Sequence, residues 1–225
     1  MGWLDKFRRK KQQIVIYNYL EEELNEYEAY IEKALGGYDE VFHEIVSPDI
    51  HLDIIIVPPT NTHPYYKLVT MGMGAYTMAV PEDLKTSSLE HAELVIYLPK
   101  DWDIRSCDER DYWPIRYLKI LGRLPLECDT WLGYGHSVHG NQEMEPLADN
   151  TQLNSFVLLN ANDLNGKIMK LELSSGKTIN FYQLFPLYQE ELEIKQAYST
   201  EALMELFNNE DRFPILNIQR KNYGK

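Results

Sequence analysis

The sequence predicts an α+β fold, in which a single domain packs a mixed β-sheet against helices. Short apolar segments with the composition of strands stand between helical segments, without the regular alternation of a parallel sheet. Of the 225 residues, 44% are hydrophobic, which is enough for a sizeable core, and no linker rich in Pro, Gly or Ser divides the chain. We expect a basic N-terminal segment over residues 1–17 and one domain over residues 18–225.

The first half of the chain predicts one helix and then four strands. Residues 18–35 carry apolar side chains at intervals of three and four, and Gly36 and Gly37 supply a stop. Apolar runs predict strands over residues 41–46, 52–57, 65–71 and 91–98. The string MGMGAYTMAVP follows the third strand at residues 71–81. Neither glycine fingerprint for phosphate is complete there, so we interpret its glycines as a turn that needs unusual backbone angles.

The second half predicts three helices and further strands. Residues 112–124 have one apolar face, Pro114 suits the first turn of a helix, and Pro125 is expected to end it. Strands are predicted over residues 155–159, 168–173 and 177–185, and the last two flank a hairpin turn, Ser-Ser-Gly. Two more helices are predicted over residues 188–196 and 200–208, and a last strand over residues 213–219.

The net charge of −13 and the pI of about 4.9 restrict the class of partner. Such an acidic chain repels phosphate backbones and anionic lipid, so we expect no nucleic-acid partner and an attraction to basic proteins. No run of about 18 apolar residues predicts a membrane span, and the basic N-terminal segment lacks the apolar core of a signal peptide. Cys107 and Cys128 form no C-x-x-C motif, which favours a cytoplasmic protein and leaves open whether they pair.

No complete catalytic motif is present. His136 and His139 lie three residues apart, which suits two metal ligands on a helix, but the surrounding glycines favour a loop and no H-E-x-x-H motif completes the set. A metal-binding protein or an enzyme using these two histidines is kept as an alternative. Paired carboxylates such as Glu190 and Glu191 are interpreted as a solvated face. We therefore expect no catalytic residue and no cofactor.

Five strings, in order along the chain, carry a family resemblance. They are HPYYKLVTMGMGAYTMAVP at residues 63–81, AELVIYLPKDW at 92–102, WPIRYLKILGRLP at 113–125, TWLGYGH at 130–136 and PLYQEEL at 186–192. Together they resemble the suppressor of fused domain family over roughly residues 38–196. The resemblance implies a non-catalytic protein-binding domain. Stand-alone bacterial members look like immunity proteins that neutralise a cognate toxin, whereas the animal member is a regulatory scaffold with an additional C-terminal domain.

These observations predict an immunity protein whose partner is a protein, such as a basic toxin domain. A regulatory scaffold like the animal family member is the other alternative. Exposed aromatic and acidic residues on loops are the usual anchors of recognition. We therefore predict partner contacts at Asp101, Trp102, Asp103, Tyr134 and His136. Whether Trp102 and Tyr134 pack against the core instead stays open, as does the oligomeric state.

Overall fold

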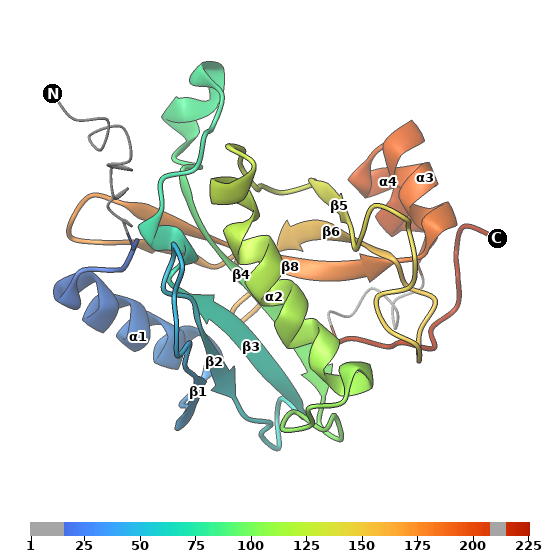
Figure 1. Ribbon diagram of the computed structural model, residues 1–225, viewed down its shortest axis with the longest axis horizontal. Helices are drawn as coiled ribbons and strands as arrows, with labels where there is room; N and C mark the ends of the chain where they lie inside the picture. Colours follow the sequence, from blue (N-terminus) through green and yellow to red (C-terminus); the bar gives the residue numbers. More distant parts are fainter. Residues whose placement is uncertain (1–15, 208–214) are drawn as a thin grey trace, which may run out of the picture.

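The computed structural model describes residues 16–207 and 215–225, so nearly all of the predicted basic segment over residues 1–17 lies outside the described residues. Within them, eight strands form one mixed sheet (Figure 1). In spatial order the strands are β1 (Glu40–Phe42), β2 (Asp53–Val57), β3 (Tyr65–Met71), β4 (His91–Pro99), β8 (Thr178–Leu187), β6 (Ser155–Asn160) and β5 (Ser137–His139), and β7 (Lys170–Glu172) also pairs with β8. β4 and β8 run parallel, while the other named pairs are antiparallel. This arrangement confirms the predicted fold class.

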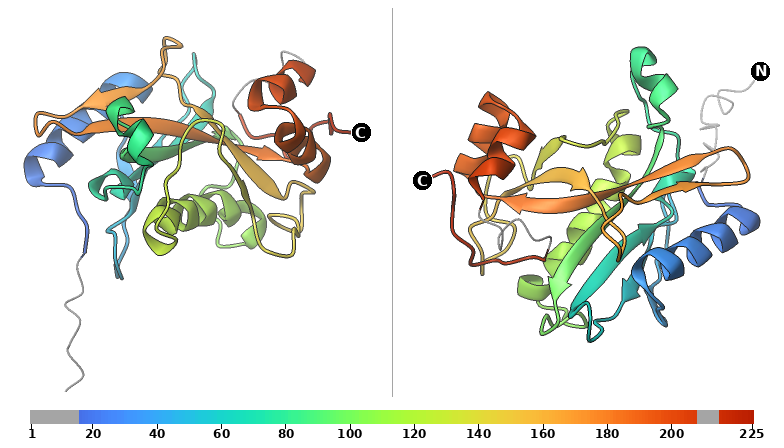
Figure 2. Two further views of the ribbon diagram at one scale, coloured as in Figure 1. Left: turned by 90° about the horizontal axis from the view of Figure 1, so that it is seen from above. Right: turned by 180° about the vertical axis from the view of Figure 1, so that it is seen from behind.

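Helices cover both faces of this sheet. They are α1 (Glu21–Leu35), α2 (Glu109–Glu127), α3 (Gln189–Ala197) and α4 (Thr200–Leu206). Ile54 and Ile56 of β2 belong to the core under α2, whereas Ile55 and Val57 belong to the core under α1, as the alternation of a strand requires. Figure 2 shows α1 and α2 on opposite sides of the sheet. No helix in the described part of the chain combines the length and apolar character needed to cross a bilayer.

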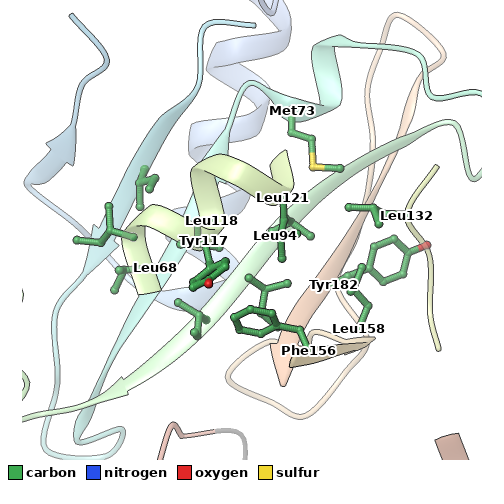
Figure 3. Packing of buried hydrophobic residues seen from close by; sticks show 14 of the residues in the cluster. Leu68, Met73, Leu94, Tyr117, Leu118, Leu121, Leu132, Phe156, Leu158 and Tyr182 are labelled. Carbon is green, nitrogen blue, oxygen red and sulfur yellow. The ribbon is translucent and has the colours of Figure 1, made fainter. Parts of the chain in front are cut away.

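The core under α2 is the larger one. Figure 3 shows side chains of α2 against side chains of the sheet, among them Leu68, Leu94, Tyr117, Leu118, Leu121 and Phe156. Fully burying a side chain of this size contributes about 2 kcal/mol. A third, smaller cluster packs α3 and α4 against the ends of β6 and β8.

The predicted strand over residues 41–46 is wrong beyond Phe42. The backbone N–H of Glu44 donates to the carboxylate of Asp53 at 2.8 Å instead of to a neighbouring strand. The carboxylate of Glu44 forms an ion pair with Arg123 of α2. Because the N–H of Glu44 is bound by a side chain, it is not available to a neighbouring strand. The strand therefore ends at Phe42 and a loop begins.

Both boundaries predicted for the helix over residues 112–124 are wrong. The helix α2 starts at Glu109, where the Asp108 side chain caps it, and continues through Pro125 to Glu127. Pro114 therefore lies in the second turn, where its missing N–H leaves the carbonyl of Arg110 without a helical donor. The side-chain amide of Asn150 donates to that carbonyl at 2.9 Å and makes the proline tolerable.

Two other segments differ from the predictions. Residues 137–139, expected in a loop, form β5 on the edge of β6. The strand predicted over residues 213–219 lies partly outside the described residues, and its described part makes a single parallel bridge between Ile215 and Tyr97 of β4. The N–H of Leu216 donates to the carbonyl of Tyr97 at 2.8 Å. The C-terminal segment thus lies along β4 as a strap.

The structure of residues 71–81 confirms that the glycines of this segment form a turn. Gly72 has a φ of +128°, and a Cβ there would collide with the backbone oxygen of His51. The amides of Gly72 and Gly74 donate to the carboxylate of Glu93 at 2.9 and 3.0 Å. The turn therefore binds a carboxyl group that belongs to the protein itself.

Candidate functional site

The loop after β4 lines a cleft of about 670 Å³, and this cleft contains three of the predicted contact residues, Asp101, Trp102 and Asp103. β4 and β8 pair over residues 91–95 and 179–183, and the cleft lies beyond the end of that pairing. One wall is the loop, and the other is the strap of residues 215–220. The region beyond the carboxyl ends of parallel strands is a common place for ligand sites in open sheets.

Trp102 is positioned by the irregular start of α2. Its indole Nε1 donates to the backbone carbonyl of Asp111 at 2.8 Å, in the turn that Pro114 disturbs. Its ring lies edge-on to the buried Trp113, with ring centroids 6.2 Å apart. Trp102 is half-buried and still lines the cleft. One part of the Trp102 side chain therefore packs against the core and another lines the cleft, while its contact with a partner stays a prediction.

Two carboxylates at this cleft, those of Asp101 and Asp103, form no ion pair within the described part of the chain. Both residues are exposed. The nearby Arg105 turns its guanidinium to Glu40 at 2.9 Å and offers only its backbone N–H to Asp103, at 3.3 Å. The mouth of the cleft therefore carries negative charge that a basic group can approach.

A buried ion pair fixes the strap that forms the second wall. Arg220 donates through both terminal nitrogens to the carboxylate of Glu191 at 2.6 Å, and the two side chains are 4% and 0% exposed. Arg220 also donates to the carbonyl of Pro186 at 2.8 Å. The interpretation of Glu191 as a solvated carboxylate is wrong. The two residues are 29 positions apart, so no local pattern in the sequence marks the pair.

Tyr134 and His136 lie on a different surface. They line a shallow cleft together with residues of α3 and α4. Tyr134 is 45% exposed and donates its hydroxyl to Glu201 at 2.8 Å. The ring of His136 lies edge-on to Trp131, with centroids 4.2 Å apart, and burial lowers the pKa of His136. Tyr134 is thus a surface residue, and His136 is held in place by its neighbours.

The five predicted contact residues therefore form two groups that the fold keeps apart. The two clefts share no lining residue. In Figure 1 the carboxyl end of β4 lies near the lower edge of the molecule, whereas β5 and α4 lie near the upper right. The sequence places the residues of both groups on loops but does not show that the loops are separated.

The histidine alternative gains no support from the geometry. In residues 16–207 and 215–225 no group of three or more His, Cys, Asp or Glu side chains is arranged to hold a metal ion. His139 lies on β5 with a buried Nδ1 that has no hydrogen-bond partner in the described part of the chain. Cys107 and Cys128 are both exposed and free, which answers the question of their pairing.

Comparisons with known proteins agree with the fold. Three of the similar solved structures illustrate this. A structure of the Sufu–Fu complex has a TM-score of 0.65 at 11% identity and covers 89% of this chain and 92% of that chain. A SUFU homolog from Neisseria gonorrhoeae has a TM-score of 0.62 at 16% identity and covers 89% and 96%. Drosophila Suppressor of Fused has a TM-score of 0.54 at 13% identity and covers 76% of this chain and 42% of that chain.

The sequence comparisons give the family. A search of the curated proteins finds no match to this chain. The family model described as Suppressor of fused protein (SUFU) matches residues 48–221, which is well over half of the 225 residues. The resemblance seen in the five strings is therefore confirmed, and the chain belongs to the Suppressor of fused protein (SUFU) family.

Proposed function

We propose that this chain is a bacterial immunity protein, which binds a basic toxin domain in the cytoplasm and neutralises it without catalysis. The observation that carries the proposal is the cleft at the end of β4. There Asp101 and Asp103 are exposed, flank the half-buried Trp102, and have no ion-pair partner among the described residues. The family is one of protein-interaction domains, and the relative in the Sufu–Fu structure is bound to a protein, Fu.

The composition of this cleft suits recognition of a basic protein. Tryptophan is among the residues that carry most binding energy at interfaces. Exposed carboxylates steer a partner of opposite charge, and such steering raises association rates towards about 10⁸ M⁻¹s⁻¹ at low salt. The net charge of −13 acts in the same direction at longer range and repels nucleic acid. The locked strap lets the cleft bind with little ordering of its walls.

The proposal requires a toxin gene beside this gene, and the test is protection from the toxin domain that it encodes. Cells that express the toxin domain should grow when the wild-type chain is co-expressed. The double variant Asp101→Asn, Asp103→Asn should lose that protection. The matched control Glu127→Gln, Glu172→Gln removes the same charge at two exposed positions away from the cleft and should retain it.

Two results would overturn the proposal. One is a purified wild-type chain that neither binds the neighbouring toxin domain at low salt nor protects cells from it. The other is equal loss of protection in the cleft variant and in the control variant, which would reduce the effect to net charge. Binding of several unrelated proteins would indicate a regulatory scaffold instead.

A further inference from the structure

A second cleft adjoins the first one beside Trp102. It has a volume of about 450 Å³, and residues of β1, β2, β3 and the loop after β4 line it. Trp102 and Asp103 line both clefts, so a partner that reaches the first cleft also meets the second. The buried Ile56 and Ile104 supply apolar lining. Apolar walls with a few fixed polar groups are the usual composition of a binding site.

A guanidinium group of the protein itself lies at this second cleft. Arg105, in the loop after β4, donates through Nη2 to Oε2 of Glu40 on β1 at 2.9 Å. Both residues line the cleft, and they are 65 positions apart in the sequence. The hydrogen bond and the charge of Glu40 raise the pKa of Arg105, and the charge of Asp39 acts in the same direction. The acidic residues of this cleft therefore already bind one guanidinium group.

The contact of Arg105 with Glu40 is weak enough to be exchanged. The side chain of Arg105 is 77% exposed, and that of Glu40 is 35% exposed. Water and salt screen an ion pair of this kind, so it adds little to stability. No second acceptor binds this guanidinium within the described chain, whereas the buried Arg220 binds Glu191 through two nitrogens. Arg220 therefore holds the fold, and Arg105 is free to leave its acceptor.

The charges of the second cleft favour another cation when Arg105 leaves. Asp39 and Asp103 are exposed, and neither forms an ion pair with any described residue. Together with Glu40 they place three carboxylates in the lining, where Arg105 is the one cation among the described residues. An anion would be repelled by this excess of negative charge. The ligand is therefore cationic, and the contact of Arg105 shows that a guanidinium suits the position of Glu40.

We propose that an arginine side chain of the protein partner replaces Arg105 at Glu40, so that Arg105 is a competitor built into the free protein. The site is open only in the fraction of molecules in which Arg105 has left Glu40, and the apparent affinity for an arginine is reduced by that fraction. A partner that also contacts the first cleft overcomes this competition, so Arg105 contributes to specificity. The inference rests on the proposed function for the identity of the partner, and on the cleft alone for the chemistry of the group.

The experiment uses Nα-acetyl-arginine amide as the probe and the full chain as the receptor. The indole N–H signal of Trp102, which lines both clefts, is followed by NMR in ¹⁵N-labelled protein, and Trp102→Phe identifies that signal. Arg105→Gln removes the competitor and should bind the probe with a Kd on the order of 1–10 mM, as suits one small group. The wild type should bind it roughly three- to tenfold more weakly. The analogue with lysine should bind Arg105→Gln several-fold more weakly than the arginine probe, because an ammonium group lacks the planar fork.

Two further variants separate competition from net charge, with circular dichroism as the check on folding. Arg110→Gln removes the same charge from an exposed arginine outside both clefts and should bind the probe like the wild type. The double variant Glu40→Gln, Arg105→Gln lacks the acceptor and should lose the gain in affinity. Equal affinity in wild type and Arg105→Gln, an equal gain in Arg110→Gln, or a gain that persists without Glu40 would overturn the proposal. The probe needs no partner protein, so such a failure would leave the toxin-protection assay unaffected.

Discussion

Carboxylates in the interior of the molecule have hydrogen-bond or ion-pair partners, whereas two carboxylates at the mouth of the cleft are exposed and form no ion pair within the described residues. Glu93 and Glu191 have no exposed surface, and hydrogen-bond donors surround both. Asp101 and Asp103 are exposed and form no ion pair with any described residue. Burying a carboxylate is tolerable only when its lone pairs are satisfied. The acidic residues thus divide into those that hold the fold and those that remain available to a partner.

The two interior carboxylates differ in how they are compensated. Glu191 faces the positive charge of Arg220. Glu93 receives hydrogen bonds from the hydroxyls of Tyr19 and Thr70 and from two glycine amides, all of them neutral donors. Burial raises the pKa of Glu93 to about 7, against the opposing effect of these hydrogen bonds. Each carboxylate joins a distant part of the chain to the sheet, and the pKa of about 7 makes the protonation of Glu93 sensitive to pH near neutrality.

Removing the counter-charge of Glu191 should have the largest effect on stability. Arg220→Met leaves a carboxylate buried without its partner, which costs about 3–5 kcal/mol of unfolding free energy. The double variant Arg220→Met, Glu191→Leu removes both charges and should recover most of that loss. Urea unfolding of the three proteins gives these values. A loss below about 1 kcal/mol in the single variant would show that the pair does not hold the strap.

The burial of Glu93 should make the stability of the protein depend on pH. Because the pKa of Glu93 in the folded protein lies above its ordinary value of 4.5, its stabilising contribution is complete at low pH and is lost as pH rises through about 7. From pH 5 to pH 8 this group should lower the unfolding free energy by about 2 kcal/mol. The measured quantity is the difference between wild type and Glu93→Gln across that range. A difference that stays constant would contradict the prediction.

Lys67 is a buried basic residue that, unlike Glu93 and Glu191, lacks a hydrogen-bond partner for its charged group among the described residues. Its side chain on β3 is 1% exposed, and its Nζ has no hydrogen-bond partner among the described residues. Burial accordingly lowers the pKa of this amine. Lys67→Met keeps a similar volume without the desolvated amine and should stabilise the protein by about 1 kcal/mol. Thermal unfolding at pH 7 measures the change, and destabilisation would reveal a favourable role for the amine.

The carboxylates at the cleft should contribute least to stability. The double variant Asp101→Asn, Asp103→Asn should unfold within about 0.5 kcal/mol of the wild type, because both residues are exposed and unpaired in the described chain. Urea unfolding at pH 7 provides the comparison with Arg220→Met. A loss of 2 kcal/mol or more would place these residues with the structural carboxylates.

Local patterns in the sequence predict the framework of this fold. The apolar runs of β2, β3 and β4 and the hairpin of β7 and β8 are confirmed because their signals lie within a few neighbouring residues. The predicted contact residues at the end of β4 do line a cleft. The expectation failed where distant side chains decide the local structure. Arg123 and Asp53 end β1 early, and Asn150 lets α2 run through Pro114.

The cleft as a whole could not be predicted for the same reason. Its second wall depends on the pairing of Glu191 with Arg220 across 29 positions, and neither residue has a distinctive neighbourhood in the sequence. The separation of Tyr134 and His136 from the cleft is likewise a property of the strand order, in which β5 lies at the far edge of the sheet from β1. A single sequence shows which residues lie in loops. The distances between those loops depend on the order of the strands in the folded sheet.

The most direct test of the proposed functional division is the association rate of the purified chain with a basic toxin domain encoded beside its gene, which is the partner that the proposal requires. Stopped-flow kinetics at several salt concentrations would compare wild type, Asp101→Asn with Asp103→Asn, and Glu127→Gln with Glu172→Gln. We predict a roughly tenfold slower association for the cleft variant at low salt, a weaker dependence on salt, and near wild-type behaviour for the control. Equal rates and equal salt dependence for the two variants would contradict the claim that these carboxylates serve a partner.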